Sequence, residues 1–398
     1  MIYELRIYHC VTGRLPALLK RFETTTLALW QQHGIRQAGF WTVLVGEGGN
    51  QDLHYLLAWE SLAERETKWN KFASDPEWLA KRTESERDGP IVASITNMFL
   101  QPTAFSAVKL NGSMPRGLDH IVHAVRDLEG AAELYRRLGF TVGARNRHSW
   151  GTHNHLVQLP GFFIELLTVV EPEKLGSDGF SKLFGRFNQS FLSNQEGLSL
   201  LLLESGDATA DAETFHSAGV AASEVMKFER EGKRPDGAPV KVAFSLVFAR
   251  DAGAPATGFA VCQQHFPENF WNPAFQQHPN TARGIAGIVL VAENPTDHHI
   301  FLSTFTGVRD LHATSSGVSA ATPRGDIKVM DPAAFRGYFG TDPPDISQGA
   351  RLAALQFHVR DRGALRAALG AGAVAFSVRM DATIVAPQTA MGATLVFE

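Results

Sequence analysis

The sequence predicts an α+β protein with several domains, and three observations support this prediction. The chain has 398 residues, which at about 100–200 residues per domain is enough for two to four domains. Its composition, with 44% hydrophobic and 20% charged residues, is that of a folded globular protein and excludes an intrinsically disordered chain. Short apolar strands alternate with helical patterns along the chain, and after residue 116 one strand–helix–strand pattern recurs.

The first part of the chain, residues 1–106, shows the order strand–helix–strand–strand–helix–helix–strand. Apolar and polar residues alternate in the first strand, and the first helix has an apolar stripe. The predicted strands are Ile2–His9, Phe40–Gly46, Leu53–Trp59 and Ile91–Leu100, and the helices are Arg14–His33, Ser61–Phe72 and one that begins at Asp75. This order predicts a ferredoxin-like unit whose open sheet face needs a cover, usually a second copy.

The rest of the chain follows a polar stretch at residues 107–116, which we interpret as a linker because it contains Gly and Pro and has no periodicity. Four similar βαβββ units then begin at Gly117, Gly197, Gly284 and Arg351, of which the third is the least regular. One such unit cannot bury both faces of its sheet. We therefore expect pairs of units to form two domains, 117–270 and 284–398, each around a central cavity.

Charge and cysteine content exclude several classes of protein. The 37 Lys and Arg residues against 41 Asp and Glu residues leave a net charge of -4, without the basic excess of a nucleic-acid or membrane-surface binder. Cys10 and Cys262 are far apart, so neither a disulfide framework nor a zinc–thiolate site is expected. No apolar stretch approaches the roughly 20 residues that cross a bilayer, and the start of the chain has no signal-peptide pattern. We expect a cytoplasmic protein with no nucleic-acid or membrane partner.

Residues 1–105 resemble the NIPSNAP family. The resemblance rests on "YELRIYHC", "LLAWESLAERETKWNKFASDPEWL" and "NMFLQPTAFS". It implies a dimeric ferredoxin-like α/β-barrel, and hence a homodimer, but no particular chemistry. The tryptophans of this part would form either a core and dimer contact or a pocket for a small apolar ligand. His33 and Arg65 are its only candidates for chemistry.

From Gly117 onward, the chain resembles the vicinal oxygen chelate superfamily, specifically its glyoxalase-like domains. The matching segments are "LDHIV" at 118–122, "GTHN" at 151–154 and "FIEL" at 163–166. In that superfamily the first strand of a unit offers a His to a metal ion and the last strand offers a Glu, and His120 and Glu165 fall at these positions. The first strand of the second unit has no such residue, so its last strand would supply Gln264 (or Gln263), with His265 as a further candidate.

A His, Glu and Gln set would suit a divalent ion such as Zn²⁺, Mn²⁺, Fe²⁺ or Ni²⁺. Such an ion could polarise two adjacent oxygens of a small-molecule substrate. The resemblance then implies a metal-dependent lyase, isomerase or ring-cleaving dioxygenase. The alternative is a metal-free protein that sequesters a small compound, as bleomycin-resistance-like members of the superfamily do. The ligand missing from the second unit favours this alternative.

His153 and His155 are two residues apart, so on a strand they share one face. If that face is turned to the cavity, they could supply a catalytic base or extra ligands. If the segment is instead an edge turn, both are solvated. In the last two units Gly287 and Ala354 stand where His120 stands in the first, so domain 284–398 is expected to be a scaffold or a cavity without metal. Nucleotide-binding and serine-hydrolase motifs are absent from the sequence.

Overall fold

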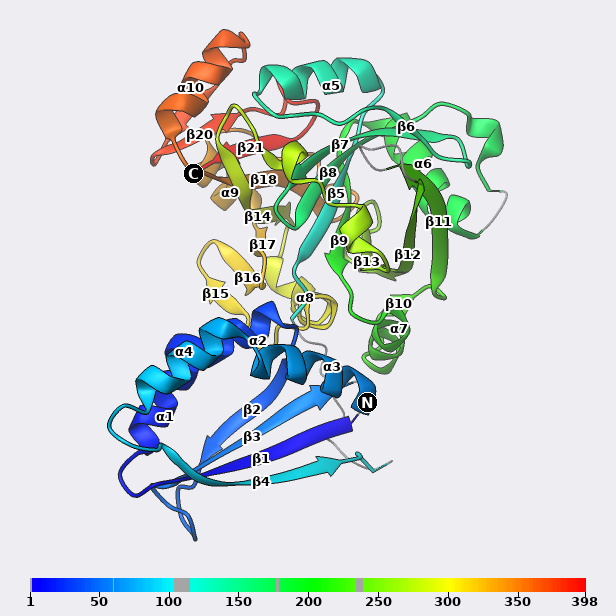
Figure 1. Cartoon of the computed structure of the whole chain (residues 1–398). Helices are drawn as coiled ribbons and strands as arrows, with labels where there is room; N and C mark the ends of the chain where they lie inside the picture. Colours follow the sequence, from blue (N-terminus) through cyan, green and yellow to red (C-terminus); the bar gives the residue numbers. More distant parts are fainter. Residues whose placement is uncertain (1, 60, 104–114, 177–178, 234–238) are drawn as a thin grey trace. The chain divides into compact units, whose positions relative to one another are not determined.

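The computed structural model describes residues 2–59, 61–103, 115–176, 179–233 and 239–398 (Figure 1). The chain divides into two compact units, Met1–Leu110 and Asn111–Glu398. Most of the predicted linker, residues 107–114, lies outside the described residues. The α+β class is confirmed, with one sheet in the first unit and two in the second.

The first unit is an antiparallel sheet with its helices on one face (Figure 1). The strands follow the ferredoxin-like order β2 (Arg36–Thr42), β3 (Asp52–Trp59), β1 (Ile2–Cys10) and β4 (Val92–Leu100). The helices are α1 (Leu15–Arg21), α2 (Leu27–Gln32), α3 (Leu62–Ala73) and α4 (Pro76–Ser85). A π-helical turn at Phe22–Thr26 joins α1 to α2, within the helix predicted from Arg14 to His33.

The strand predicted at Phe40–Gly46 is displaced in the structure. Gly34, with a φ of +64°, ends the preceding helix, so β2 starts already at Arg36. β2 pairs with β3 only as far as Thr42, opposite Leu53, and the following Leu44 is 96% exposed. The apolar residues after Thr42 therefore belong to the turn and not to the strand.

Aromatic side chains fill the space between this sheet and its helices. Trp30 and Trp59 are buried there as part of the core, whereas Trp41 is exposed. A buried carboxylate, Glu4, accepts hydrogen bonds from Arg6 and Arg65 at 2.8 and 2.9 Å. Burial acts to raise the pKa of Glu4, but the two guanidinium groups outweigh it and hold this pKa below its ordinary value.

The second unit contains the four predicted βαβββ repeats, two in each of its sheets. The first sheet consists of β5 (Leu118–Ala124), β6 (Asn146–Arg147), β7 (Thr152–Leu159), β8 (Phe162–Val169), β9 (Gly197–Glu204), β10 (Ala221–Ala222), β11 (Met226–Lys233), β12 (Pro239–Arg250) and β13 (Gly258–Gln264). The second consists of β14 (Ala282–Val291), β15 (His312–Thr314), β16 (Gly317–Ala321), β17 (Asp326–Met330), β18 (Arg351–Val359), β19 (Ser377–Arg379), β20 (Ala382–Val385) and β21 (Thr394–Phe397). The pairs β5–β9 and β14–β18 form the antiparallel centres of the two sheets.

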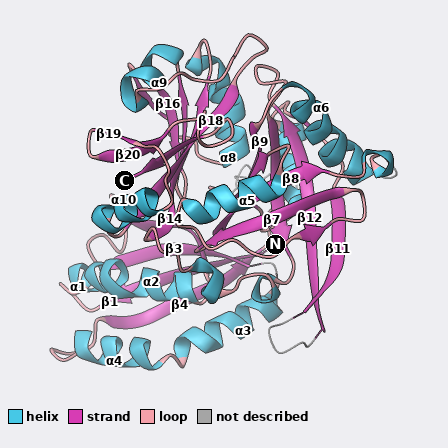
Figure 2. Ribbon diagram, turned by 90° about the horizontal axis from the view of Figure 1, so that it is seen from above, coloured by secondary structure: helices cyan, strands magenta, loops and turns pink. Residues whose placement is uncertain are grey.

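Each repeat places a helix after its first strand. These helices are α5 (Leu128–Arg137), α7 (Ala208–Ser217), α8 (His299–Thr306) and α10 (Arg362–Ala371). Asp127, Asp207 and Asp361 cap α5, α7 and α10 by accepting hydrogen bonds from backbone N–H groups of the first turn. The third repeat lacks this cap, in agreement with its irregular sequence. α5 and α10 lie side by side (Figures 1 and 2).

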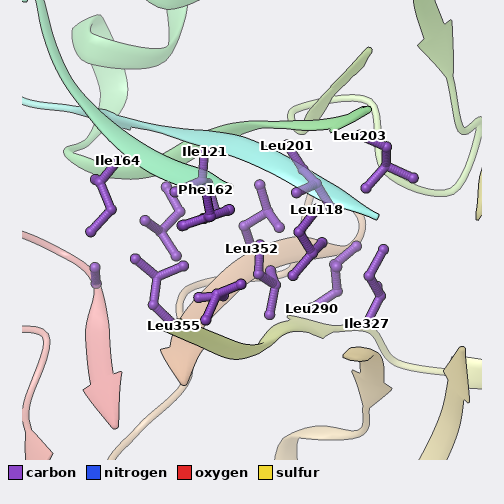
Figure 3. Close-up of a cluster of buried hydrophobic side chains, with 14 of the residues drawn as sticks. Leu118, Ile121, Phe162, Ile164, Leu201, Leu203, Leu290, Ile327, Leu352 and Leu355 are labelled. Carbon is purple, nitrogen blue, oxygen red and sulfur yellow. The ribbon is translucent and has the colours of Figure 1, made fainter. Parts of the chain in front are cut away.

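The two sheets pack face to face through a continuous apolar core (Figure 3). Leu118, Ile121 and Ile164 of the first sheet lie in it with Leu290 and Ile327 of the second. Because strand side chains alternate between faces, the neighbours of these residues point to the opposite face of each sheet. Any cavity of the glyoxalase-like type therefore lies on the faces turned away from this core.

Candidate active-site cavity

A cavity of about 80 Å³ lies on the outer face of the first sheet, with a polar end and aromatic walls. The polar residues that line it are His120, Asn146, His148, Asn154 and Glu165. The largest group in its wall is aromatic: Trp150, Phe163, Phe180, Phe184, Phe228, Phe244 and Phe270. This combination is typical of a small-molecule site, in which apolar walls exclude water and a few polar groups fix the orientation.

His120 owes its position to an irregularity in β5. The register between β5 and β9 shifts between Leu118 and His120. His120 lines the cavity, and Asp119 lies beside it and near Cys262, another lining residue. The carboxylate of Asp119 accepts a hydrogen bond from Nδ1 of His120 at 2.5 Å, and both side chains are buried. The imidazole stacks on Phe163, with 4.2 Å between ring centroids and an interplanar angle of 11°. Nδ1 thus carries the proton of this hydrogen bond, and Nε2 is the ring nitrogen left for another partner.

Glu165 lies on β8, the neighbour of β5, and lines the same cavity. Its Oε1 accepts a hydrogen bond of 2.6 Å from Nδ2 of Asn154, whose Oδ1 in turn accepts from Asn146 at 2.9 Å. Burial raises the pKa of Glu165, and the opposing effects of His120 and Asn154 are smaller. A carboxyl group whose pKa is raised by burial holds its proton to a higher pH than a solvated one, which suits it to act as an acid.

Gln264, the third predicted metal ligand, is engaged differently. Its Nε2 donates to the second carboxylate oxygen of Asp119 at 2.8 Å, and its Oε1 is buried without a partner among the described residues. The structure thus brings His120 and Glu165 to one cavity, whereas Gln264 binds Asp119 and is not among the described residues that line this cavity.

Cys262 forms a second grouping with the Asp119–His120 pair. One potential ligand atom from each of Asp119, His120 and Cys262 lies within 4.8 Å of the others, and all three residues are buried. Burial raises the pKa of the Cys262 thiol, and the nearby charges of Asp119 and Glu165 raise it further. The thiol is therefore protonated here, and both oxygens of Asp119 already accept hydrogen bonds. As arranged, Asp119 forms a hydrogen-bonded network with His120 and Gln264, beside the Cys262 thiol.

His153 and His155 do not line the described cavity. Nδ1 of His153 lies 3.0 Å from Nε of Arg145, and Nδ1 of His155 donates to the carbonyl of Gly143 at 2.8 Å. Both histidines share one face of β7, as predicted, but Asn154 between them is the residue turned to the cavity. Both are also buried, so the edge-turn interpretation does not describe them.

The aromatic walls come from segments that are distant in the sequence. Phe228 on β11 and Phe244 on β12 are directly paired, with rings at an interplanar angle of 3°. Phe180 and Phe184 come from the stretch between β8 and the helix α6 (Arg186–Asn194). No local pattern in the sequence marks these residues as cavity residues. Asp119 and Asn154 could have been found from the sequence, because Asp119 directly precedes His120 and Asn154 lies between His153 and His155.

Comparison with known protein families agrees with this division. Residues 3–107 match the NIPSNAP model, and residues 118–306 match the model described as a glyoxalase-like domain. The chain joins a NIPSNAP domain to a glyoxalase-like domain. Both predicted resemblances are thereby confirmed, and the cavity with His120 and Glu165 lies inside the glyoxalase-like match. A comparison with curated proteins finds no significant match.

Several solved structures are similar to parts of this chain. A hypothetical protein from Staphylococcus aureus is 14% identical, with a TM-score of 0.50 over 71% of this chain and 99% of that chain, which shows a shared fold. A NIPSNAP family protein of unknown function from Agrobacterium tumefaciens is 27% identical over 27% of this chain and 94% of that chain, with a TM-score of 0.25. A variant of 4-hydroxymandelate synthase from Streptomyces coelicolor is 12% identical over 67% of this chain and 77% of that chain, with a TM-score of 0.43.

Proposed function

We propose that the glyoxalase-like domain is an enzyme that transfers protons on a small carbonyl compound with an aromatic or branched apolar body. The observation that carries this proposal is the oriented Asp119–His120 pair, which shares one aromatic-walled cavity with the buried Glu165. An isomerase or lyase that proceeds through an enol needs one base and one acid of this kind.

The two groups have distinct roles in the proposed reaction. Nε2 of His120 takes a proton from the carbon next to the carbonyl, and Asp119 stabilises the imidazolium that forms. Glu165 donates its proton to the carbonyl oxygen, which gives a neutral enol, and Asn154 holds the carboxylate that remains. In an enediol or a dienol, His120 then returns its proton to a different carbon while the enol hydroxyl returns its proton to Glu165, which completes an isomerisation and restores both side chains. The aromatic walls bind the apolar body and exclude water.

This proposal is tested by solvent exchange on a defined probe. Wild-type protein in D₂O should accelerate deuterium uptake next to the carbonyl of 4-phenyl-2-butanone, followed by proton NMR. H120Q and E165Q should each lower the rate by about 10²–10⁴-fold, the usual contribution of one acid or base. H216Q, which changes a histidine on the surface of α7, is the matched control and should keep the rate. A wild-type rate equal to the protein-free rate would contradict the proposal.

A divalent ion fits this cavity only in part. His120 and Glu165 are the two predicted ligands that line it, whereas catalytic zinc sites commonly have three protein ligands. The proposed proton transfer therefore uses no ion and should survive dialysis against EDTA. Near one Zn²⁺, Mn²⁺, Fe²⁺ or Ni²⁺ per chain by elemental mass spectrometry, lost in H120Q, would instead favour a metal-dependent lyase, isomerase or dioxygenase.

The second candidate function is metal-free binding of a small aromatic compound without chemistry. The aromatic wall of the cavity favours it, because such walls suit sequestration as well as catalysis. Trp150 lines the cavity, so its fluorescence reports on occupancy. If 4-phenyl-2-butanone quenches this fluorescence equally in the wild type and in H120Q, and neither accelerates exchange, the binding function replaces the enzymatic one.

We further propose that the protein is a homodimer formed through its NIPSNAP domain. β4 is an edge strand of that sheet, and Ile95, Met98, Phe99 and Leu100 on it are exposed. An edge strand with exposed apolar residues is usually covered by another chain. Sedimentation of the full chain should give a dimer, and M98E should shift it toward the monomer. A monomeric wild type would refute this part of the proposal.

The described residues contain no helix that is long and apolar enough to cross a membrane. A cytoplasmic location stays a prediction.

A further inference from the structure

The second sheet repeats the strand pairing of the first, residue by residue. β14 runs parallel to β17 as β5 runs parallel to β8, and Val289 opposes Lys328 as Val122 opposes Glu165. The preceding pairs, Ile288–Ile327 and Ile121–Ile164, all lie in the core between the sheets, so the two registers are equivalent. Lys328 therefore occupies, on the outer face of the second sheet, the position of Glu165 in the first.

The position of His120 is also changed in the second sheet. Gly287 stands there, opposite Gln356 on β18. A Cβ atom at Gly287 would lie 2.9 Å from the carbonyl oxygen of Asp326 and 3.2 Å from Oε1 of Gln356. No histidine fits at this position without movement of the backbone. The second sheet has thus exchanged a His–Glu pair for a glycine and a lysine.

A separate cavity of about 190 Å³ surrounds this lysine. Nζ of Lys328 donates a hydrogen bond to Oε1 of Gln356 at 2.9 Å. Gln356 is buried, with 5% of its surface exposed. The hydroxyl-bearing side chains at the cavity are Thr314, Ser316, Ser319 and Tyr338. Val318, Met330 and Phe339, which are buried, form its apolar side.

The ammonium group of Lys328 lies beyond ion-pair distance of the described carboxylates, of which that of Asp326 shares its face of β17. None of the ion pairs among the described residues includes it, whereas Lys68, Lys174 and Lys241 each pair with a glutamate. Of the three N–H donors of an ammonium group, the bond to Gln356 uses one. A partly buried ammonium with free donors and adjacent hydroxyl groups is suited to bind an anion.

We propose that this second cavity binds a small carboxylate with an apolar body, whose carboxylate pairs with Lys328. One lysine balances one negative charge, which matches a carboxylate better than a phosphate with its charge of about −1.5 to −2. The buried Val318, Met330 and Phe339 side accepts the apolar body. The site is independent of the proposed reaction, because it lies on the other sheet and shares no lining residue with the first cavity.

Calorimetric titration of the full chain with benzoate tests this inference. Wild-type protein should bind benzoate, and K328M should weaken binding at least ten-fold because the ammonium is lost. K81M removes a lysine from an exposed helix position, so it makes the same change in net charge and should leave the affinity unchanged within two-fold. H120Q alters the first cavity and should also bind benzoate as the wild type does.

Several outcomes would overturn the inference. These are absence of benzoate binding in the wild type, equal binding by K328M, or loss of binding in H120Q, which would move benzoate to the first cavity. Tighter binding of inorganic phosphate than of benzoate would overturn the assignment to a carboxylate. If K328M does not fold, Q356L replaces it. This variant installs the leucine found at the equivalent Leu202 position and should also weaken binding, because it removes the group that holds Nζ.

Discussion

The two sheets of the second unit share one framework and differ in chemistry. On the faces that pack together, the same positions are apolar in both sheets, as the pairs Ile121–Ile164 and Ile288–Ile327 show. On the outer faces, Glu165 of the first sheet corresponds to Lys328 of the second. Packing between the sheets therefore fixes the strand register, and the outer face is left to vary in charge without loss of the fold.

The irregularity in the first strand is shared as well. The register shift between Leu118 and His120 has its counterpart between Ile285 and Gly287. In the first sheet this shift brings Asp119 beside His120, whereas Ala286 and Gly287 in the second offer no such pair. The shift is thus part of the framework, and the chemistry depends on which side chains occupy it.

The largest effect is expected from exchanging the charges of the two cavities. E165K would place an unpaired ammonium in the buried aromatic cavity and should lower the free energy of unfolding by about 3–5 kcal/mol. K328E changes a half-buried residue and loses one hydrogen bond, so it should cost about 1 kcal/mol. Urea unfolding of both variants measures the difference. Equal losses would show that the two cavities do not differ in burial as described.

A second contrast concerns His123, whose counterpart in the second sheet is Leu290. Nε2 of His123 donates to the carbonyl of Met391 at 2.9 Å, and Nδ1 accepts from the Tyr135 hydroxyl at 2.9 Å. H123L leaves the buried Tyr135 hydroxyl and the partly buried Met391 carbonyl without these bonds and should lower the free energy of unfolding by about 2–3 kcal/mol. L290A, an apolar truncation at the equivalent position, separates this polar loss from simple loss of packing. An unchanged urea midpoint in H123L would disprove the importance of the bridge.

Glu165 should also give the first sheet a pH dependence that the second lacks. Its pKa in the folded state is raised above the ordinary value of 4.5, so the folded protein binds more protons than the unfolded chain above pH 4.5. This contribution to stability is fully present below pH 4.5 and is lost as the pH rises through the folded-state pKa, by at most about 1.4 kcal/mol per pH unit. The difference in unfolding free energy between wild type and E165Q should follow this curve, and E133Q, at an exposed glutamate, should show no such difference.

The smallest effect is expected on the far face of β7. His153 is held by Arg145 and does not line the described cavity, so H153Q should change the deuterium-exchange rate by less than two-fold. The same assay measures it. A loss comparable to that of H120Q would restore His153 to the catalytic role that the sequence suggested.

Repetition made much of this architecture predictable from the sequence. The four units were recognisable because each begins with an apolar strand, and in three of them an aspartate starts the following helix. His120 and Glu165 followed from the resemblance, and the structure brings both to one cavity. The strand predicted at Phe40–Gly46 was displaced because the apolar run continues into a turn. The ends of β2 are set by Gly34, which ends the preceding helix, and by the loss of pairing with β3 after Thr42, and not by hydrophobicity.

The rest of the site depends on tertiary structure. Whether His153 or Asn154 faces the cavity depends on which face of β7 each residue occupies. Because the residues from Thr152 to His155 are all polar or titratable, the sequence does not reveal which face is turned to the cavity. The aromatic wall is assembled from Phe163, Phe180, Phe228 and Phe270, which are separated by long stretches of chain. The sequence also did not show that Gln264 binds Asp119, because this contact depends on the register shift in β5 between Leu118 and His120.

The close packing at Gly287 has a consequence for how the two halves could change over time. Since a Cβ atom there would meet the backbone of Asp326, a histidine at this position requires the strand to move before its imidazole can serve any chemistry. The route from the second sheet to a copy of the first therefore requires at least two coordinated substitutions with a strand displacement.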